Sequence, residues 1–435
     1  MTLGIINRIK SIVRSEIVRV FSLTSVSTLV KMCTGLVSMK IIALLVGPAG
    51  IALLGQLNNF VSIILSFAGG GINNGITKYT SQYRDNPDRL SRYLSVGLRL
   101  TVISGSTIGI LLILLAIPLS SVILLNPDYA VVFRIFGFTL LLYAANNFIL
   151  SVINGFKEFR QFVTVNIAGS IIGLIFTVSL VLLYRTTGAL VAAVTYQSVV
   201  LVVTLLIVRK AAWMNIHTLF RRFDKKIAAQ FLKYTLMTLV SALMLPAAQL
   251  LLRGYIMTEI SDTAAGWWEG MCRISNIYLM VVTSSFSVYY LPRLSEIADS
   301  LELRREIAKA FRIIAPLLLT GFTVIYLSRH FIVRMLFTEQ FEPMTRLFIW
   351  QMAGDFFKIS SWLVAFVMIA KAYTRTFIIS EILAAAAYIA LGYWLIKLNG
   401  VVGACQAHFI QYILYSAAMV LIFYKLLFTP HKIKQ

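Results

Sequence analysis

Acidic residues, cysteines and histidines are all scarce in this sequence of 435 residues. Only 13% of the residues are charged, whereas soluble domains carry about 25% charged residues. The three cysteines, Cys33, Cys272 and Cys405, lie far apart in apolar segments, so we expect no disulfide framework. The four histidines are equally dispersed and lack the close spacing of metal ligands. We therefore expect neither a metal nor a cofactor.

Long apolar runs, in contrast, are abundant. Hydrophobic residues make up 59% of the sequence, which is more than one soluble core can bury. A bilayer accommodates them, because a helix of about 20 apolar residues spans a hydrocarbon core of about 30 Å. Turn-forming pairs such as Gly47-Pro48 and Asn86-Pro87 separate the runs. The sequence therefore predicts an all-α integral membrane protein with twelve spans, at about 22–46, 50–72, 94–118, 130–151, 162–184, 188–208, 231–255, 264–290, 308–328, 344–370, 376–397 and 401–426.

Basic residues give the sequence a net charge of +22, which in a soluble protein would suggest nucleic-acid binding. They lie in short connections between the apolar runs, without an RNA-binding or helix-turn-helix signature, so we expect no nucleic-acid partner. Most of them lie in alternate connections, which include the N-terminus, the 209–233 segment and the C-terminus. The positive-inside rule then predicts that both termini are cytoplasmic, as an even number of spans requires.

Landmarks of the first half of the sequence recur in the second half about 212 to 216 positions later. Gly188-Ala189, for example, matches Gly400-Val401, and Asn154 matches Ile369. This repeat predicts two six-helix bundles around a central cavity, as parallel repeats that enter the membrane from the same side. We expect an amphipathic interfacial helix at 1–21, bundles at 22–208 and 231–427, a cytoplasmic linker at 209–230 and a cytoplasmic tail at 428–435.

Two lysines of the first span, Lys31 and Lys40, have no acidic residue within that span. An ionisable side chain inside a bilayer costs about 2.5 to 3.5 kcal/mol, so it needs a partner or a wet cavity. Lys40 lies near the turn at Gly47 and can extend toward the membrane surface, which makes Lys31 the stronger candidate. With two basic residues of later spans, these lysines predict a positive cavity for an anionic cargo, lined by Lys31, Lys40, Arg273 and Lys358.

Acidic residues of the second half are candidates for ion coupling or for ion pairs. Asp355 and Lys358 are three residues apart and Glu269 and Arg273 are four apart, so each pair shares a helix face, and we expect both ion pairs to form. A purely structural role for each pair remains an open alternative. Glu381 lies nearer the end of its span, and its coupling role is weighed against simple exposure at that end.

A polar segment follows the second span on the cytoplasmic side, directly after Gly69-Gly70-Gly71. This glycine run lacks the Gly-Lys-Ser/Thr ending of a phosphate loop, and we expect it to bend or unwind the helix end. Basic and aromatic residues next to it can then approach a lipid headgroup. The residues of this predicted headgroup approach are Asn73, Asn74, Lys78, Tyr79 and Arg84.

Several motifs spread over nearly the whole chain resemble the Wzx-type flippases for lipid-linked oligosaccharides. They include Gly47-Pro48-Ala49-Gly50, Gly75-Ile76-Thr77-Lys78-Tyr79, Ser285-Phe286-Ser287-Val288-Tyr289 and the stretch from Gly354-Asp355 to Lys358. That family belongs to the multidrug/oligosaccharidyl-lipid/polysaccharide exporter superfamily. The resemblance implies a water-filled cationic cavity, alternating access and a location in the bacterial inner membrane.

The resemblance also implies the cargo and the partners. The cargo would be an undecaprenyl-diphosphate-linked glycan, either an O-antigen unit or the precursor of the enterobacterial common antigen. Partners would be membrane lipids and the polymerase and chain-length regulator of the same pathway.

Two other functions compete with this reading. A drug or cation exporter of the same superfamily would favour acidic over basic residues deep in the spans, whereas this chain shows the reverse. A membrane glycan polymerase would need catalytic residues on a sizeable outward loop, and the longest outward connection, around 328–344, is short. The sequence therefore favours a transporter over an enzyme.

Overall fold

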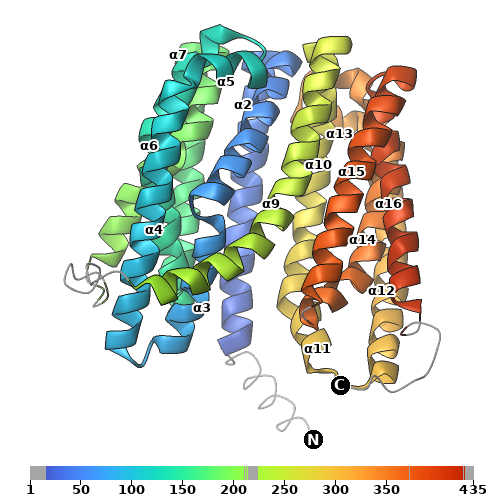
Figure 1. The fold of residues 1–435 in the computed structure, drawn as a ribbon. Coiled ribbons are helices and arrows are strands. Elements are labelled where there is room, and N and C mark those ends of the chain that lie inside the picture. The colour runs from blue at the N-terminus through green and yellow to red at the C-terminus, as the bar shows by residue number, and fades with distance from the viewer. Residues whose placement is uncertain are drawn as a thin grey trace, which may run out of the picture. The chain divides into compact units, whose positions relative to one another are not determined.

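The computed structural model describes residues 16–209, 211, 213, 224–371, 373–424 and 426. Most of the predicted interfacial helix at 1–21, most of the predicted linker at 209–230 and the predicted tail at 428–435 lie outside these residues. The regular elements of the described part are all helices, as the sequence predicts (Figure 1).

By packing, the described chain divides into two compact units. Unit 1 takes the chain up to Leu45 and from Val61 to Leu239, and unit 2 takes Val46–Phe60 and the chain from Val240 onward. The predicted division into bundles at 22–208 and 231–427 rests on the sequence repeat and stays a prediction.

The helices before the linker are α2 (Glu16–Leu65), the π-helix η1 (Ser66–Gly70), α3 (Gly71–Tyr83), α4 (Pro87–Leu114), α5 (Ala116–Ile123), η2 (Pro127–Tyr129), α6 (Ala130–Gly155) and α7 (Phe159–Val208). Those after it are α9 (Lys225–Glu259), α10 (Asp262–Ser285), the π-helix η4 (Phe286–Tyr290), α11 (Leu291–Glu296), α12 (Ser300–Leu327), α13 (Arg329–Leu336), η5 (Glu339–Leu347), α14 (Phe348–Ala370), α15 (Thr374–Asn399) and α16 (Val402–Ile422). The two π-helices directly precede α3 and α11, which supports the repeat, because π-helices are rare.

Twelve crossings of the membrane follow from these helices. Within the described residues, eight helices are long and apolar enough to cross. Two of them, α2 and α7, are 50 residues long and break at Gly47 and Arg185, so each supplies two crossings. With 35 and 24 residues, α9 and α10 are also long enough to span and supply the remaining two.

Two adjacent residues of the sequence, Gly47 and Pro48, explain the break in α2. Gly47 has a φ of 71°, a conformation that glycine adopts without steric cost. Pro48 follows it, and its missing N–H suits the first turn of the next helix segment. The Gly47-Pro48 pair therefore ends one span and begins the next with almost no connecting loop.

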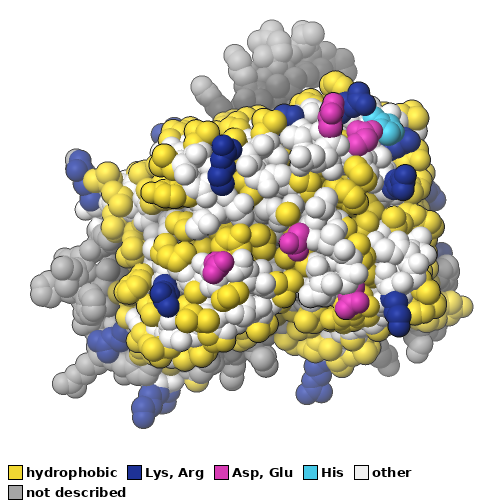
Figure 2. Space-filling view, turned by 90° about the horizontal axis from the view of Figure 1, so that it is seen from above, with side chains coloured by type: hydrophobic (Ala, Val, Ile, Leu, Met, Phe, Trp, Pro, Cys, Tyr) yellow, Lys and Arg dark blue, Asp and Glu magenta, His cyan; other side chains and the backbone are white. Residues whose placement is uncertain are grey.

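Lipid-facing surface accounts for much of the hydrophobic composition. Leu114 and Leu327 each expose 73% of their surface, and Leu183 exposes 72%. Figure 2 looks onto the upper helix ends of Figure 1 and shows charged side chains scattered among hydrophobic ones. Such exposed leucines are costly in water and favourable in hydrocarbon, so the chain is a multi-pass membrane protein.

Helices within each unit approach closely at glycines. In unit 1, a Cβ on Gly109 would lie 2.6 Å from the carbonyl oxygen of Gly137, so α4 and α6 are in backbone contact there. In unit 2, a Cβ on Gly354 would lie 2.4 Å from the ring of His408, which brings α16 against α14. The contact between Gly354 and His408 places the imidazole of His408 beside Asp355, the acidic residue of α14.

Candidate functional site

Asp355 is completely buried in unit 2 and receives hydrogen bonds from three helices. Ser275 Oγ of α10 donates at 2.6 Å, and the hydroxyl of Tyr278 also donates to the same oxygen. His408 Nε2 of α16 lies 3.0 Å from the other oxygen, and Gln351 Nε2 of α14 lies 3.3 Å from the first. A buried carboxylate needs such donors, because its loss of hydration is costly.

The predicted ion pair between Asp355 and Lys358 is wrong. Both carboxylate oxygens of Asp355 are already bonded to donors from α10, α14 and α16. The Lys358 ammonium instead lies 5.4 Å from the ring centroids of both Trp362 and Tyr412. Aromatic faces stabilise a cation without neutralising it, and Lys358 forms no ion pair with a carboxylate of the described residues.

The predicted ion pair between Glu269 and Arg273 is confirmed, at 2.8 Å. A second arginine, Arg253 of α9, also contacts this carboxylate, at 2.5 Å, and is fully buried. Arg253 additionally lies 5.2 Å from the ring of Trp268. Two guanidinium groups thus share one carboxylate, and this triad of Arg253, Glu269 and Arg273 has a net charge of +1.

Gly55, in the segment of α2 that belongs to unit 2, packs directly on this triad. A Cβ at Gly55 would lie 2.4 Å from the carboxyl group of Glu269. The next residue, Gln56, bonds to α9, where its amide donates to the backbone oxygen of Leu250 at 3.0 Å. The absence of a side chain at Gly55 therefore lets α2 close over the charged triad.

The two predicted lysines of the first span lie in unit 1. Lys31 is exposed on α2, and Lys40 is partly buried. Arg273 and Lys358 lie in unit 2. A single cavity lined by all four basic residues therefore stays a prediction.

The predicted headgroup approach on α3 divides into buried and exposed parts. Tyr79 is buried, and its ring centroid lies 4.5 Å from that of Tyr93 and 5.3 Å from that of Phe231. Burial raises the pKa of the Tyr79 hydroxyl. Lys78, Asn74 and Arg84 are exposed, whereas Asn73 is partly buried. Exposed bases are the part of this segment that can meet a headgroup.

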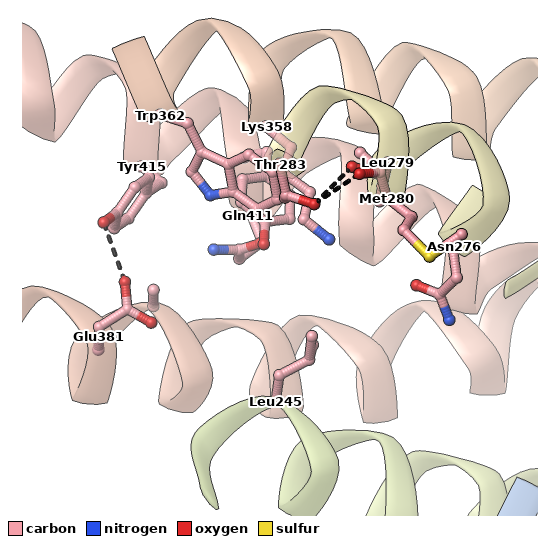
Figure 3. A pocket seen from close by; sticks show the side chains of 12 residues that line it. Leu245, Asn276, Leu279, Met280, Thr283, Lys358, Trp362, Glu381, Gln411 and Tyr415 are labelled. Carbon is pink, nitrogen blue, oxygen red and sulfur yellow. Dashed lines mark hydrogen bonds between the residues drawn. The ribbon is translucent and has the colours of Figure 1, made fainter. Parts of the chain in front are cut away.

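A cavity of about 410 Å³ opens inside unit 2 next to Lys358. Its walls come from α9, α10, α14, α15 and α16, and Figure 3 shows Trp362, Lys358 and Gln411 grouped on one side. Glu381 accepts a hydrogen bond from the Tyr415 hydroxyl at 3.0 Å at one end of this cavity, and Asn276 lies at the other (Figure 3).

Sequence reasoning found the charged residues of this cavity but missed its uncharged ones. Lys358 and Glu381 were expected to be functional, whereas Asn276, Trp362 and Gln411 carried no charge to single them out. A search for amides and aromatic residues within predicted spans would have found them. Arg253 was missed because its partner lies on another helix.

A second cavity, of about 360 Å³, has mostly apolar walls from α15 and α16. It shares Ala384, Gln411 and Tyr415 with the polar cavity. A polar and an apolar chamber therefore adjoin within unit 2.

Solved structures of membrane transporters share the fold of this chain. An inward-facing multidrug resistance MATE family transporter of the MOP superfamily matches with a TM-score of 0.75 and 14% identity, over 91% of this chain and 95% of that one. The lipid II flippase MurJ, in an inward closed conformation, matches with a TM-score of 0.69 and 14% identity, over 94% and 90%. This chain therefore has the same fold as these two transporters, which is the fold that the sequence motifs predict.

Sequence comparisons narrow this class. Residues 17–298 match the family described as polysaccharide biosynthesis protein. The lipid III flippase of Escherichia coli (strain K12) is 31% identical over 392 residues, which cover 90% of this chain and 94% of that protein. The lipid III flippase of Shigella flexneri matches to the same extent. This chain belongs to the polysaccharide biosynthesis protein family, and the predicted resemblance is confirmed.

Proposed function

We propose that this chain is a flippase that moves an undecaprenyl-diphosphate-linked oligosaccharide from the cytoplasmic to the periplasmic leaflet by alternating access. The observation that carries the proposal is its 31% identity, over 90% of the chain, to a protein named lipid III flippase. A flippase is a transporter, and the MATE and MurJ folds of the solved relatives agree with this role rather than with an enzyme.

The basic residues of the spans give the proposal its chemistry. Lys31, Lys40, Arg273 and Lys358 screen the diphosphate while the glycan crosses, and the lipid tail stays in the bilayer. Lys358 supports this role, because its ammonium is buried next to a cavity and forms no ion pair with a carboxylate in the described part of the chain. The cargo would be an O-antigen unit or the precursor of the enterobacterial common antigen.

Two sources of energy are open to such a flippase. Moving one charge across 100 mV is worth about 2.3 kcal/mol, and an anionic headgroup that leaves a negative cytoplasm moves downhill. Coupling to a proton or cation would use Asp355 with His408, or Glu381, because these are the acidic groups held near Lys358 in unit 2. Glu269 is less suited, since two arginines already neutralise it.

The cellular setting follows from the same proposal. The protein would lie in the bacterial inner membrane with both termini in the cytoplasm. It would contact membrane lipids through Lys78 and Arg84 of the predicted headgroup approach, and work beside a polymerase and a chain-length regulator.

Deleting the gene tests the function directly. We expect one lipid-linked glycan to accumulate on the inner leaflet, and its identity names the cargo. Purified protein in liposomes should move that glycan to the outer leaflet, and runs with and without a potential or a pH gradient identify the energy source. A deletion strain with unchanged lipid-linked glycans but greater sensitivity to drugs would point to the exporter instead.

Lys31 tests the predicted screening role. We expect Lys31→Ala to abolish export without preventing membrane insertion. Lys397→Ala, at an exposed position near the end of α15, is the control and should export normally. Full complementation by Lys31→Ala would remove Lys31 from the site.

A further inference from the structure

The polar cavity of unit 2 combines side chains that do not suit a lipid or a cation. One base, Lys358, and one acid, Glu381, face it together with the amides of Asn276 and Gln411 and the indole of Trp362. Its volume of about 410 Å³ falls within the range of about 300 to 1,000 Å³ that is usual for small-ligand pockets. A cationic drug would meet the ammonium of Lys358, and an alkyl chain would leave the amides without partners.

We propose that this cavity is the sugar-binding subsite of the cargo headgroup, in which a pyranose ring packs on Trp362 and an attached anionic group binds Lys358. The inference rests on the proposed function and adds a defined place and ligand class to it. The anionic group is either the diphosphate next to the first sugar or the carboxylate of an acidic sugar.

The aromatic wall supports a sugar ring. Trp362 is partly buried on α14, and its side chain lines the cavity next to that of Tyr412. An indole offers a large flat apolar surface with a fixed orientation, which fits the C–H face of a pyranose. Hydrogen bonds from the rim of the ring can then reach the polar groups around it.

The amides of the cavity are not engaged by other described residues. Gln411 is only 5% exposed, and neither its amide nor that of Asn276 forms a hydrogen bond within the described part of the chain. Buried polar groups are rarely left without partners, and each unmade hydrogen bond costs about 1 to 3 kcal/mol. Sugar hydroxyls both donate and accept, as an amide requires of a ligand.

The charged groups of the cavity, Lys358 and Glu381, are placed to recognise a sugar that carries an anionic group. The Lys358 ammonium lies beside two aromatic rings and forms no ion pair with any described carboxylate, so an incoming anion gains a charge-assisted contact. Glu381 has one oxygen bonded to Tyr415, which leaves the carboxylate able to accept from a sugar hydroxyl. The base and the acid therefore recognise different parts of one ligand.

Binding of defined lipids to the full chain in nanodiscs, followed by native mass spectrometry, tests the proposal. The probes are undecaprenyl diphosphate, undecaprenyl-diphosphate-N-acetylglucosamine and the same lipid extended by a uronic acid. We expect Trp362→Leu to weaken binding of both sugar-bearing lipids about tenfold, a loss of about 1.4 kcal/mol, and to leave undecaprenyl diphosphate unchanged. Trp394→Leu is the matched control, because Trp394 lies on α15 and is 60% exposed.

Lys358→Met separates the two sources of the anion. If the diphosphate binds Lys358, the variant weakens all three lipids. If a sugar carboxylate binds it, the variant weakens only the lipid that carries the uronic acid. Lys397→Met is the control and should bind all probes as the wild type does.

Two results would overturn the inference. The first is Trp362→Leu and Lys358→Met binding every probe like their controls, while the wild type still moves the glycan in liposomes. The second is equal weakening of sugar-free and sugar-bearing lipids by Gln411→Leu, the variant that replaces Trp362→Leu if the latter does not fold. A wild type that neither binds nor moves any of these lipids would instead refute the proposed function.

Discussion

Unit 1 and unit 2 contain corresponding helices, yet they bury different kinds of side chain. Among the described side chains, the buried acids, bases and histidines are Arg253, Glu269, Asp355, Lys358 and His408, and all belong to unit 2. Unit 1 buries amides and hydroxyls, such as Asn146, which bonds Gln197 at 3.0 Å and Thr204 at 2.7 Å. Neutral groups of this kind join helices at little cost, whereas buried charges are expensive and are usually retained for function.

Corresponding positions show the same contrast. The repeat matches Asn154 to Ile369, 215 positions later, and Gly188 to Gly400, 212 positions later. With these offsets, Tyr143 of α6 corresponds to Lys358, and Tyr196 of α7 corresponds to His408. Tyr143 and Tyr196 lie close enough to interact with each other. A neutral tyrosine pair in unit 1 thus stands where unit 2 carries the ammonium and imidazole of its candidate site.

The largest expected effect comes from breaking the arginine triad of unit 2. Glu269→Gln would leave Arg253 and Arg273 without a counter-charge, and removal of one partner from a buried ion pair costs about 3 to 5 kcal/mol. We expect a large fall in the thermal unfolding temperature of the purified protein. Glu259→Gln, at an exposed position on α9, is the control. Equal stability of the two variants would show that the triad is not a structural element.

A charge placed in unit 1 tests whether the interior of unit 1 is less able than that of unit 2 to hold a buried charge. Tyr143→Lys would put an ammonium at the position that corresponds to Lys358, where the neighbouring side chain is Tyr196. We expect a loss of about 2.5 to 3.5 kcal/mol, seen as reduced membrane insertion or a lower unfolding temperature. Tyr143→Phe should be much milder. If Tyr143→Lys were tolerated like Tyr143→Phe, unit 1 would also hold a buried cation, and the two units would not differ in this property.

The packing of Gly55 on Glu269 predicts a steric effect. Gly55→Ala would place a methyl group 2.4 Å from the carboxyl group, and such overpacking costs about 1 to 3 kcal/mol. Gly321→Ala on α12 is the control, because no atom lies within 4 Å of a Cβ there. We expect only Gly55→Ala to lower the unfolding temperature. A stable Gly55→Ala variant would mean that α2 can withdraw from the triad at no cost.

Apolar periodicity and turn residues predicted much of the fold, because they act locally. The Gly47-Pro48 break and the Glu269–Arg273 pair depend on residues at most four positions apart, and both are present. The site depends on distant residues instead. Ser275 and His408 lie 80 and 53 positions from Asp355, and they take the oxygens that a local rule assigned to Lys358. The sequence alone does not show how the helices pack, so it does not show which donors bond to the carboxylate of Asp355.

The uncharged residues of the cavity were unpredictable for a different reason. Tryptophan and glutamine within an apolar span are compatible with packing, interfacial anchoring and ligand binding alike. Only the cavity distinguishes Trp362, which lines it, from Trp394, which is exposed on α15. Charge identifies a functional span, whereas the shape of the packed helices identifies the ligand-facing residues.

The smallest expected effect compares two histidine–carboxylate pairs within unit 2. His408 is buried against Asp355, whereas His330 contacts Glu342 with more than a third of both side chains exposed. His408→Gln replaces one donor of a buried carboxylate and should cost about 1 to 3 kcal/mol, whereas loss of an exposed pair costs at most about 1 kcal/mol. Unfolding temperatures of His408→Gln and His330→Gln give the stability difference. Flipping rates in liposomes give a second measurement. If His408 is purely structural, the His408→Gln protein loses only stability. If His408 is a coupling residue, flipping by the variant also loses its dependence on an imposed pH gradient.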